Sequence, residues 1–89
     1  MQIEELGSDA ATDALRRLRK VEGQVRGLQR MIDEGRDCED VLRQIAAASS
    51  ALRRVGVNLA VSGLEHCVAH EGADGPARDR FRQAILELS

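Results

Sequence analysis

The apolar residues of this chain repeat at the spacing of an α-helix, and this pattern constrains the fold more than any other feature. The first run has steps of three and four residues and consists of Leu15, Leu18, Val21, Val25, Leu28 and Ile32. Such a run places its members on one face of a helix. A second run extends from Val41 to Leu64. Because Phe81 is the sole aromatic residue and β-branched residues form no long alternating run, we expect an all-α fold.

Helix-breaking and capping residues divide the periodic part of the chain into three expected helices, at about residues 12–34, 38–70 and 76–88. Gly35 suits the left-handed position after the first helix, and Asp37 can cap the second. Pro76 suits the first turn of the third helix. Residues 1–10 lack periodicity, so we expect a flexible N-terminal tail followed by one helical domain over residues 11–89.

A short connection at Gly35 and Arg36 predicts that the first two helices form an antiparallel hairpin. A chain of 89 residues is marginal as a single folded unit, because it buries only roughly 60–65% of its unfolded surface. One hairpin cannot cover its apolar stripe on both sides, whereas two copies can do so as an antiparallel four-helix bundle. We therefore expect a homodimer as the minimal unit.

The charges are segregated, although the formal net charge is only −2. Between Ala14 and Arg30 the one acid is Glu22, so ion pairs along this helix should be scarce. A surface of this kind favours an anionic partner such as duplex DNA, and a merely solvated basic face is the alternative. The candidate DNA-binding residues are Arg16, Arg17, Arg19, Lys20 and Arg26, joined by Arg53 and Arg54 from the second helix.

Cys38 and Cys67 lie 29 residues apart on the second expected helix. This separation is about eight turns, so both side chains share a face, and their axial distance is roughly 43 Å. Bonded cysteines have Cα atoms about 6 Å apart, so these two cannot meet within one chain. A two-fold axis near Leu52 and Arg53 places Cys38 opposite Cys67 of the partner subunit, which gives two identical dithiol sites per dimer. The alternative is that both are buried small apolar side chains.

Several classes of protein do not fit the sequence. It has no basic-then-apolar leader and no apolar stretch long enough for a membrane span, so we expect a cytoplasmic protein with reduced thiols and no membrane partner. Neither a Cys-x-x-Cys motif nor an activated nucleophile is present, so we expect no enzyme. A helical interaction module that does not bind DNA remains an alternative.

Three blocks of sequence resemble the copper-sensitive operon repressor (CsoR) family. They are RLRKVEGQVRG from Arg17, EGRDC ending at Cys38, and VLRQIAA from Val41. The resemblance implies a three-helix protomer, a dimeric four-helix core and a homotetramer, which acts as a repressor that binds double-stranded operator DNA without inducer and leaves it when the inducer arrives. It also implies that Arg17 and Arg54 contact DNA, with Arg19 beside them.

The resemblance also bears on the inducer. Copper sensors of the family carry a His four residues before the second Cys, and Gly63 occupies this position here. A chain with both thiols and without this His most resembles the CsoR-like sulfurtransferase repressor (CstR) branch, whose inducers are persulfides and polysulfides. We therefore expect these species to convert Cys38 and the partner's Cys67 to di- or trisulfides, with no cofactor required. The alternative inducer is Cu(I), held by the same thiolates and His70; the role of His66 stays open.

Overall fold

The computed structural model describes residues 1–72 and 75–88, without the side chains of residues 71, 76 and 77. It contains a short 3-10 helix, η1 (Ile3–Leu6), and three α-helices, α1 (Ser8–Asp33), α2 (Cys38–Glu71) and α3 (Pro76–Leu86). The described ranges contain no strand, and none of their helices is long and apolar enough to cross a membrane. The prediction of an all-helical protomer with three α-helices is confirmed.

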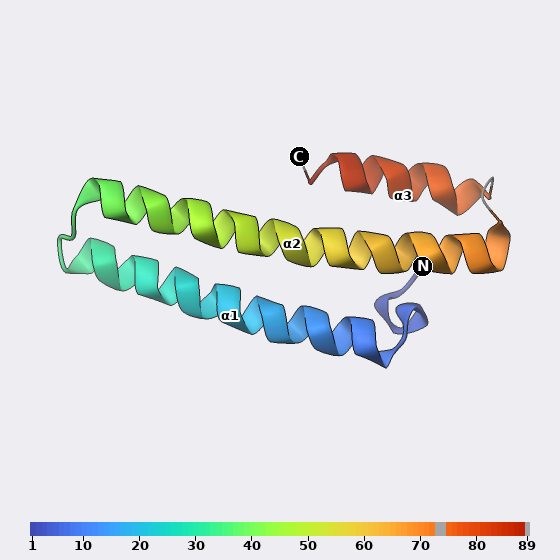
Figure 1. The fold of residues 1–89 in the computed structure, drawn as a ribbon, viewed down its shortest axis with the longest axis horizontal. Helices are drawn as coiled ribbons and strands as arrows, with labels where there is room; N and C mark the ends of the chain where they lie inside the picture. Colours follow the sequence, from blue (N-terminus) through green and yellow to red (C-terminus); the bar gives the residue numbers. More distant parts are fainter. Residues whose placement is uncertain (73–74, 89) are drawn as a thin grey trace.

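The turn between α1 and α2 makes these helices an antiparallel pair that lies side by side (Figure 1). Gly35 has a φ of +69°, which favours glycine. The amide of Gly35 donates to the carbonyl of Ile32 (3.1 Å), and that of Arg36 donates to the carbonyl of Met31 (2.9 Å). These two hydrogen bonds form a Schellman motif, so Gly35 ends α1 as expected. Asp37 precedes α2, although its side chain makes no capping hydrogen bond.

The N-terminal segment, for which the sequence predicts a flexible tail over residues 1–10, contains η1 and the first residues of α1. Here α1 begins at Ser8, earlier than the expected residue 12, and the residue before it is Gly7 with a φ of +96°. The amide of Gln2 donates to the Glu5 carboxylate (3.1 Å), which closes the first turn of η1. This local capping and the sharp bend at Gly7 let η1 fold back, where it contacts both α1 and α2.

The third helix runs antiparallel along the C-terminal half of α2, on the side away from α1 (Figure 1). Two interior glycines of α2 allow it to approach closely. A Cβ atom placed on Gly56 would lie 2.8 Å from Cδ2 of Leu88. A Cβ atom placed on Gly63 would collide with the ring of Phe81, whose two Cε atoms would be 2.7 and 2.8 Å away. Both glycines therefore serve the packing of α3.

The protomer is a single layer of helices with little interior. Its principal extents are 52 × 24 × 13 Å, and the shortest of them is close to the diameter of one helix, about 10–12 Å. In the part of the chain that the structure describes, the buried hydrophobic side chains are few and mostly small: Val21, Ala48, Val55, Ala60 and Cys67. Many larger apolar side chains stay open to solvent, including Ile32 (64% exposed) and Leu42 (59%). One protomer therefore leaves much of its apolar stripe uncovered.

Candidate functional site

The two cysteines occupy opposite ends of α2. Cys38 is the first residue of the helix and is exposed, whereas Cys67 lies four residues before its end and is only 3% exposed. The helix is continuous between them, so their axial separation is roughly 43 Å. The two thiols of one chain therefore cannot share a ligand or a disulfide, as the spacing predicts.

The third helix, α3, covers the face of α2 that carries Cys67, at a position one turn before this cysteine. Gly63 precedes Cys67 by four residues, so both lie on nearly the same face, and Gly63 is buried. The ring of Phe81 fills the space that a side chain on residue 63 would need. Residue 63 can thus contribute no metal ligand unless Phe81 moves. Sequence reasoning identified the missing ligand but not the aromatic ring that takes its place.

The two histidines near Cys67 interact with each other. Their rings are stacked with centroids 4.0 Å apart, and Nδ1 of His70 lies 2.9 Å from the carbonyl oxygen of His66. When Nδ1 carries the proton it donates to this carbonyl, which leaves the lone pair of Nε2 on His70 free. His66 faces η1, with Nε2 3.9 Å from a carboxylate oxygen of Glu5. Among the described residues of one protomer, no three His, Cys, Asp or Glu side chains converge to hold a metal ion.

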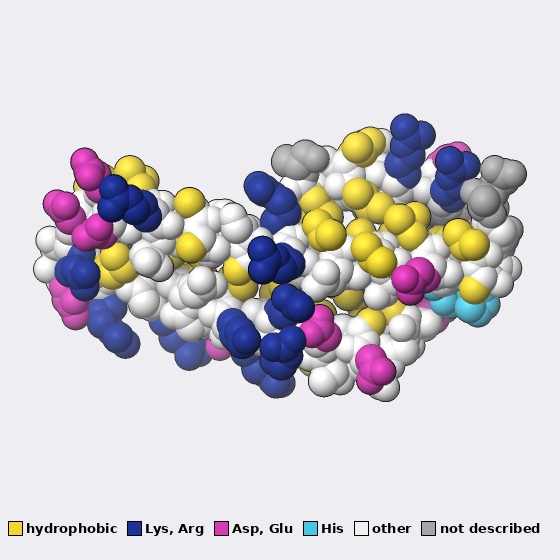
Figure 2. Space-filling view, viewed as in Figure 1, with side chains coloured by type: hydrophobic (Ala, Val, Ile, Leu, Met, Phe, Trp, Pro, Cys, Tyr) yellow, Lys and Arg dark blue, Asp and Glu magenta, His cyan; other side chains and the backbone are white. Residues whose placement is uncertain are grey.

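The candidate DNA-binding residues form what we call the basic surface: Arg16, Arg17, Arg19, Lys20, Arg26, Arg53 and Arg54. All of them are exposed except Arg17, which is half-buried. Figure 2 shows that Lys and Arg side chains gather across the middle of the molecule. Arg17 borders a small cleft between α1 and α2 together with Val55 and Asn58, which places it close to the turn of α2 that carries Arg54. The structure thus brings basic side chains of two helices to one region.

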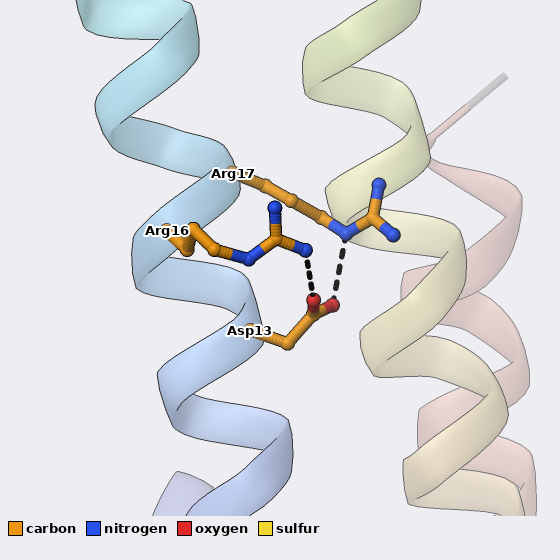
Figure 3. A network of polar contacts seen from close by, with 3 residues as sticks. All are labelled: Asp13, Arg16 and Arg17. Carbon is orange, nitrogen blue, oxygen red and sulfur yellow. Dashed lines mark hydrogen bonds and ion pairs between the residues drawn. The ribbon is translucent and has the colours of Figure 1, made fainter.

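Ion pairs along α1 are more frequent than the sequence analysis predicts. Asp13 accepts hydrogen bonds from Arg16 (2.7 Å) and Arg17 (2.8 Å), as Figure 3 shows, and Arg26 pairs with Glu22 (2.9 Å). The expectation of scarce pairing is wrong because the stretch considered began one residue after Asp13. The hydrogen bond from Arg16, followed by that from Arg17, holds the pKa of Asp13 below its ordinary value.

Four members of the basic surface form no ion pair with any residue that the structure describes. They are Arg19, Lys20, Arg53 and Arg54.

Asp13 is a functional candidate that the sequence reasoning missed. Its position three and four residues before two arginines is the standard spacing for ion pairs on a helix, so a wider window would have found it.

A family model described as metal-sensitive transcriptional repressor matches residues 10–89 of the chain. The chain belongs to this family. The cysteines and the basic surface are therefore considered as parts of a metal-sensitive transcriptional repressor. No solved structure gives a significant match.

Three curated relatives of this repressor family share the core of the sequence. The copper-sensing transcriptional repressor RicR of Mycobacterium tuberculosis is 57% identical over 60 residues, which are 67% of this chain and 62% of RicR. CsoR of Bacillus subtilis is 42% identical over 72 residues, which are 81% of this chain and 67% of that protein. CsoR of Mycobacterium tuberculosis strain H37Rv is 33% identical over 72 residues, 81% of this chain and 60% of CsoR. The matched segments thus span about two thirds or less of each relative.

These relatives correct the expectation about the inducer and the cofactor. We expected no required cofactor and placed Cu(I) behind per- and polysulfides, because Gly63 removes one ligand of the copper site. The relatives are copper-sensing repressors, which contradicts the expectation of no cofactor and favours Cu(I) over sulfur species as the inducer. The physical reason is that Gly63 lowers the number of donors but leaves two soft sulfur ligands, the type that Cu(I) prefers.

Proposed function

We propose that the protein is a Cu(I)-responsive transcriptional repressor. Its basic surface binds operator DNA in the copper-free state, and Cu(I) held by Cys38 of one protomer and Cys67 of its partner ends this binding. The observation that carries the proposal is the position of two sulfur donors at opposite ends of one unbroken helix, in a chain whose relatives sense copper. Each donor needs a second chain to complete a site.

The exposed apolar side chains support an antiparallel dimer. Leu15 on α1 is 52% exposed, and Leu42, Ile45 and Leu52 on α2 are 59%, 43% and 51% exposed. Covering such side chains is the main driving force for association. A two-fold axis near Leu52 pairs the N-terminal half of one α2 with the C-terminal half of the other, so Cys38 approaches the end of the partner helix that carries Cys67.

The residues at this end of α2 suit Cu(I) with few donors. When bound, Cu(I) would supply a bond to each of two thiolates and so join the protomers; thiolates are among its preferred ligands. Cys67 would hold the ion from one side and the exposed Cys38 of the partner from the other. Nε2 of His70 is the further donor within reach of this turn, since Nδ1 already faces a carbonyl. Because Cys67 is 3% exposed, its neighbours must shift before the partner reaches it.

The basic surface supports the DNA-binding part of the proposal. Arg19, Lys20, Arg53 and Arg54 carry charges that no described acid neutralises, and a two-fold dimer doubles their number. Basic side chains gain affinity for duplex DNA from phosphate contacts and the release of counterions. The chain has few rings on which bases could stack, since Phe81 is its sole aromatic residue. The ring of Phe81 packs on Gly63. We therefore attribute the affinity for DNA to contacts between the basic surface and the phosphates of a duplex.

Subunit mixing tests whether the site lies between chains. Neither Cys38→Ser nor Cys67→Ser alone should bind Cu(I) tightly or release a labelled duplex from the promoter of the chain's own gene. A mixed dimer of the two variants has one site with both thiols and one with none, so mixing should restore part of the copper binding and the copper-dependent release. Mixing Cys38→Ser with the double variant is the matched control and should restore neither.

Two results would contradict the proposal. Full copper response in either single variant would show that one thiol suffices. Failure of the mixture to exceed its control, with subunit exchange verified by mass, would show that the two cysteines do not act across one interface.

A second candidate inducer is a per- or polysulfide, which would place the protein in the CstR branch. It is favoured by the packing of Phe81 on Gly63, which leaves a site of thiols without a third ligand from residue 63. One thiolate attacks the terminal sulfur of a polysulfide, and the shortened polysulfide leaves as an anion. The partner thiolate then attacks the cysteine sulfur of this persulfide, forms an inter-subunit disulfide and expels hydrosulfide. A crosslink that appears with polysulfide in the wild type, and in neither single variant, would support this candidate.

A further inference from the structure

The carboxylate of Asp13 bridges two arginines of the basic surface. One oxygen accepts a hydrogen bond from Nη2 of Arg16 at 2.7 Å, and the other accepts one from Nε of Arg17 at 2.8 Å (Figure 3). Both donors reach back along α1, over three and four residues. Of the acids in the described part of the chain, Asp13 alone is shown with hydrogen bonds from two arginines.

A carboxylate and a DNA phosphate compete for the same guanidinium donors. Both anions offer two oxygen acceptors to the planar guanidinium group of arginine, which binds each of them with short charge-assisted hydrogen bonds. With Asp13 ionised, the trio carries a net charge of +1 instead of the +2 of the two arginines alone. The hydrogen bonds from Arg16 and Arg17 lower the pKa of this carboxylate, which favours its ionised form. The competing anion is thus present wherever DNA binding is measured.

Asp13 is accessible enough for such an exchange of partners. Its side chain is 37% exposed, and those of Arg16 and Arg17 are 53% and 34% exposed. Exposed ion pairs contribute little net stability, so a phosphate can replace the carboxylate at small cost. Arg17 also lies beside the turn of α2 that precedes Asn58, near Arg54, which pairs with no acid among the described residues.

We infer that Asp13 is an internal competitor that lowers the affinity of the basic surface for duplex DNA by occupying Arg16 and Arg17. This inference rests on the proposed DNA-binding function. The opposite role, in which Asp13 holds both arginines in place for DNA, predicts an effect of the opposite sign. Competition is favoured because the Asp13 oxygens take up donor groups of both arginines while adding a negative charge that repels phosphate.

The expected effect of Asp13→Asn on the affinity for duplex DNA depends on the salt concentration. Each additional neutralised phosphate makes log K fall more steeply with log salt, by about 0.9. If the variant gains about one phosphate contact per protomer bound, its affinity advantage over wild type should shrink by about 3.5-fold for every fourfold rise in salt. At low salt the variant should therefore bind more tightly, and at high salt the two proteins should converge.

The test measures fluorescence anisotropy of a labelled mixed-sequence duplex with wild type, Asp13→Asn and Asp33→Asn over a series of salt concentrations. Asp33 ends the same helix, is exposed and forms no ion pair with the described residues, so its variant makes the same change in net charge away from the basic surface. Asp13→Asn should raise affinity and steepen the salt dependence, whereas Asp33→Asn should change both less. In an Arg16→Gln, Arg17→Gln background, Asp13→Asn should lose its extra effect.

The outcomes separate this inference from the proposed function. Absence of duplex binding by the wild type overturns the DNA-binding function and this inference with it. If the wild type binds the duplex and the two asparagine variants have equal effects, the inference is overturned and the DNA-binding function stands. Weaker binding by Asp13→Asn than by the wild type leads to the same conclusion. An effect of Asp13→Asn that persists when Arg16 and Arg17 are replaced also overturns the inference. Circular dichroism of each variant shows whether the helices are retained.

Discussion

The contact between Gly63 and Phe81 gives a sharp test of how α3 sits on α2. The substitution Gly63→Ala adds one methyl group where the ring of Phe81 already lies, with both Cε atoms within 2.8 Å of the new Cβ. To accept it, the ring has to turn or α3 has to move outward from α2. An alanine in an open helix would do the opposite and favour folding, because glycine has the lower helix propensity.

The two contributions can be compared. Inserting a methyl group into a packed contact costs typically about 1–3 kcal/mol. The gain in helix propensity from glycine to alanine is about 1 kcal/mol. We therefore expect Gly63→Ala to lower the free energy of unfolding by about 0–2 kcal/mol in the wild-type background. In a Phe81→Ala background the space is open, so the same change should raise it by about 1 kcal/mol.

Urea unfolding followed by circular dichroism, at one protein concentration for all four proteins, completes this double-mutant cycle. The constant concentration matters because association contributes to apparent stability. The coupling free energy should be about 1–3 kcal/mol, since the two side chains compete for the same space. An equal stabilisation by Gly63→Ala with and without Phe81 would refute the reasoning and show that α3 does not rest on this turn.

Three further predictions follow from the described residues. Cys38 should react with iodoacetamide much faster than Cys67, as read by peptide mass spectrometry, because Cys67 is 3% exposed; equal rates in the folded protein would contradict the placement of its neighbours. Gly35→Ala should lower the free energy of unfolding by about 1–2 kcal/mol in urea, because a φ of +69° is strained for a residue with a Cβ, and an unchanged midpoint would argue against the Schellman turn. The ion pairs of Asp13 should add stability that is present above its unfolded pKa of 3.8 and is lost as pH falls through the lower folded value, because they depress that pKa. The difference in thermal midpoint between wild type and Asp13→Asn should therefore vanish in acid, and a pH-independent difference would count against these ion pairs.

The features that sequence predicts well here are those set by local interactions. The apolar period of α1 and α2, the left-handed Gly35 and the first-turn Pro76 each depend on neighbouring residues in the chain. The same holds for the separation of Cys38 and Cys67, since an unbroken helix converts a residue count directly into a distance. For this reason one chain cannot bring its two thiols together.

Two features that sequence misses involve contacts between distant segments. Gly56 and Gly63 look like two costly interior glycines of a helix until α3 is seen to rest on them through Leu88 and Phe81. The 3-10 helix η1 is the second case, because it folds back onto α2, which lies far from it in the sequence. Periodicity shows that a helix has an apolar face, but it does not show which segment covers that face.

The inducer illustrates the same limit at the candidate site. One missing donor at residue 63 led us to rank sulfur species above copper, although the relatives are copper-sensing repressors. The missing donor changes how many ligands are present, whereas the preference for Cu(I) follows from the softness of the two sulfur atoms that remain. The ring of Phe81 fills the space beside residue 63, so the proposed site would draw its donors from Cys67, its neighbours on α2 and a second chain. The proposed Cu(I) site therefore requires a second chain, because roughly 43 Å of continuous helix separates the two sulfur atoms that one chain provides.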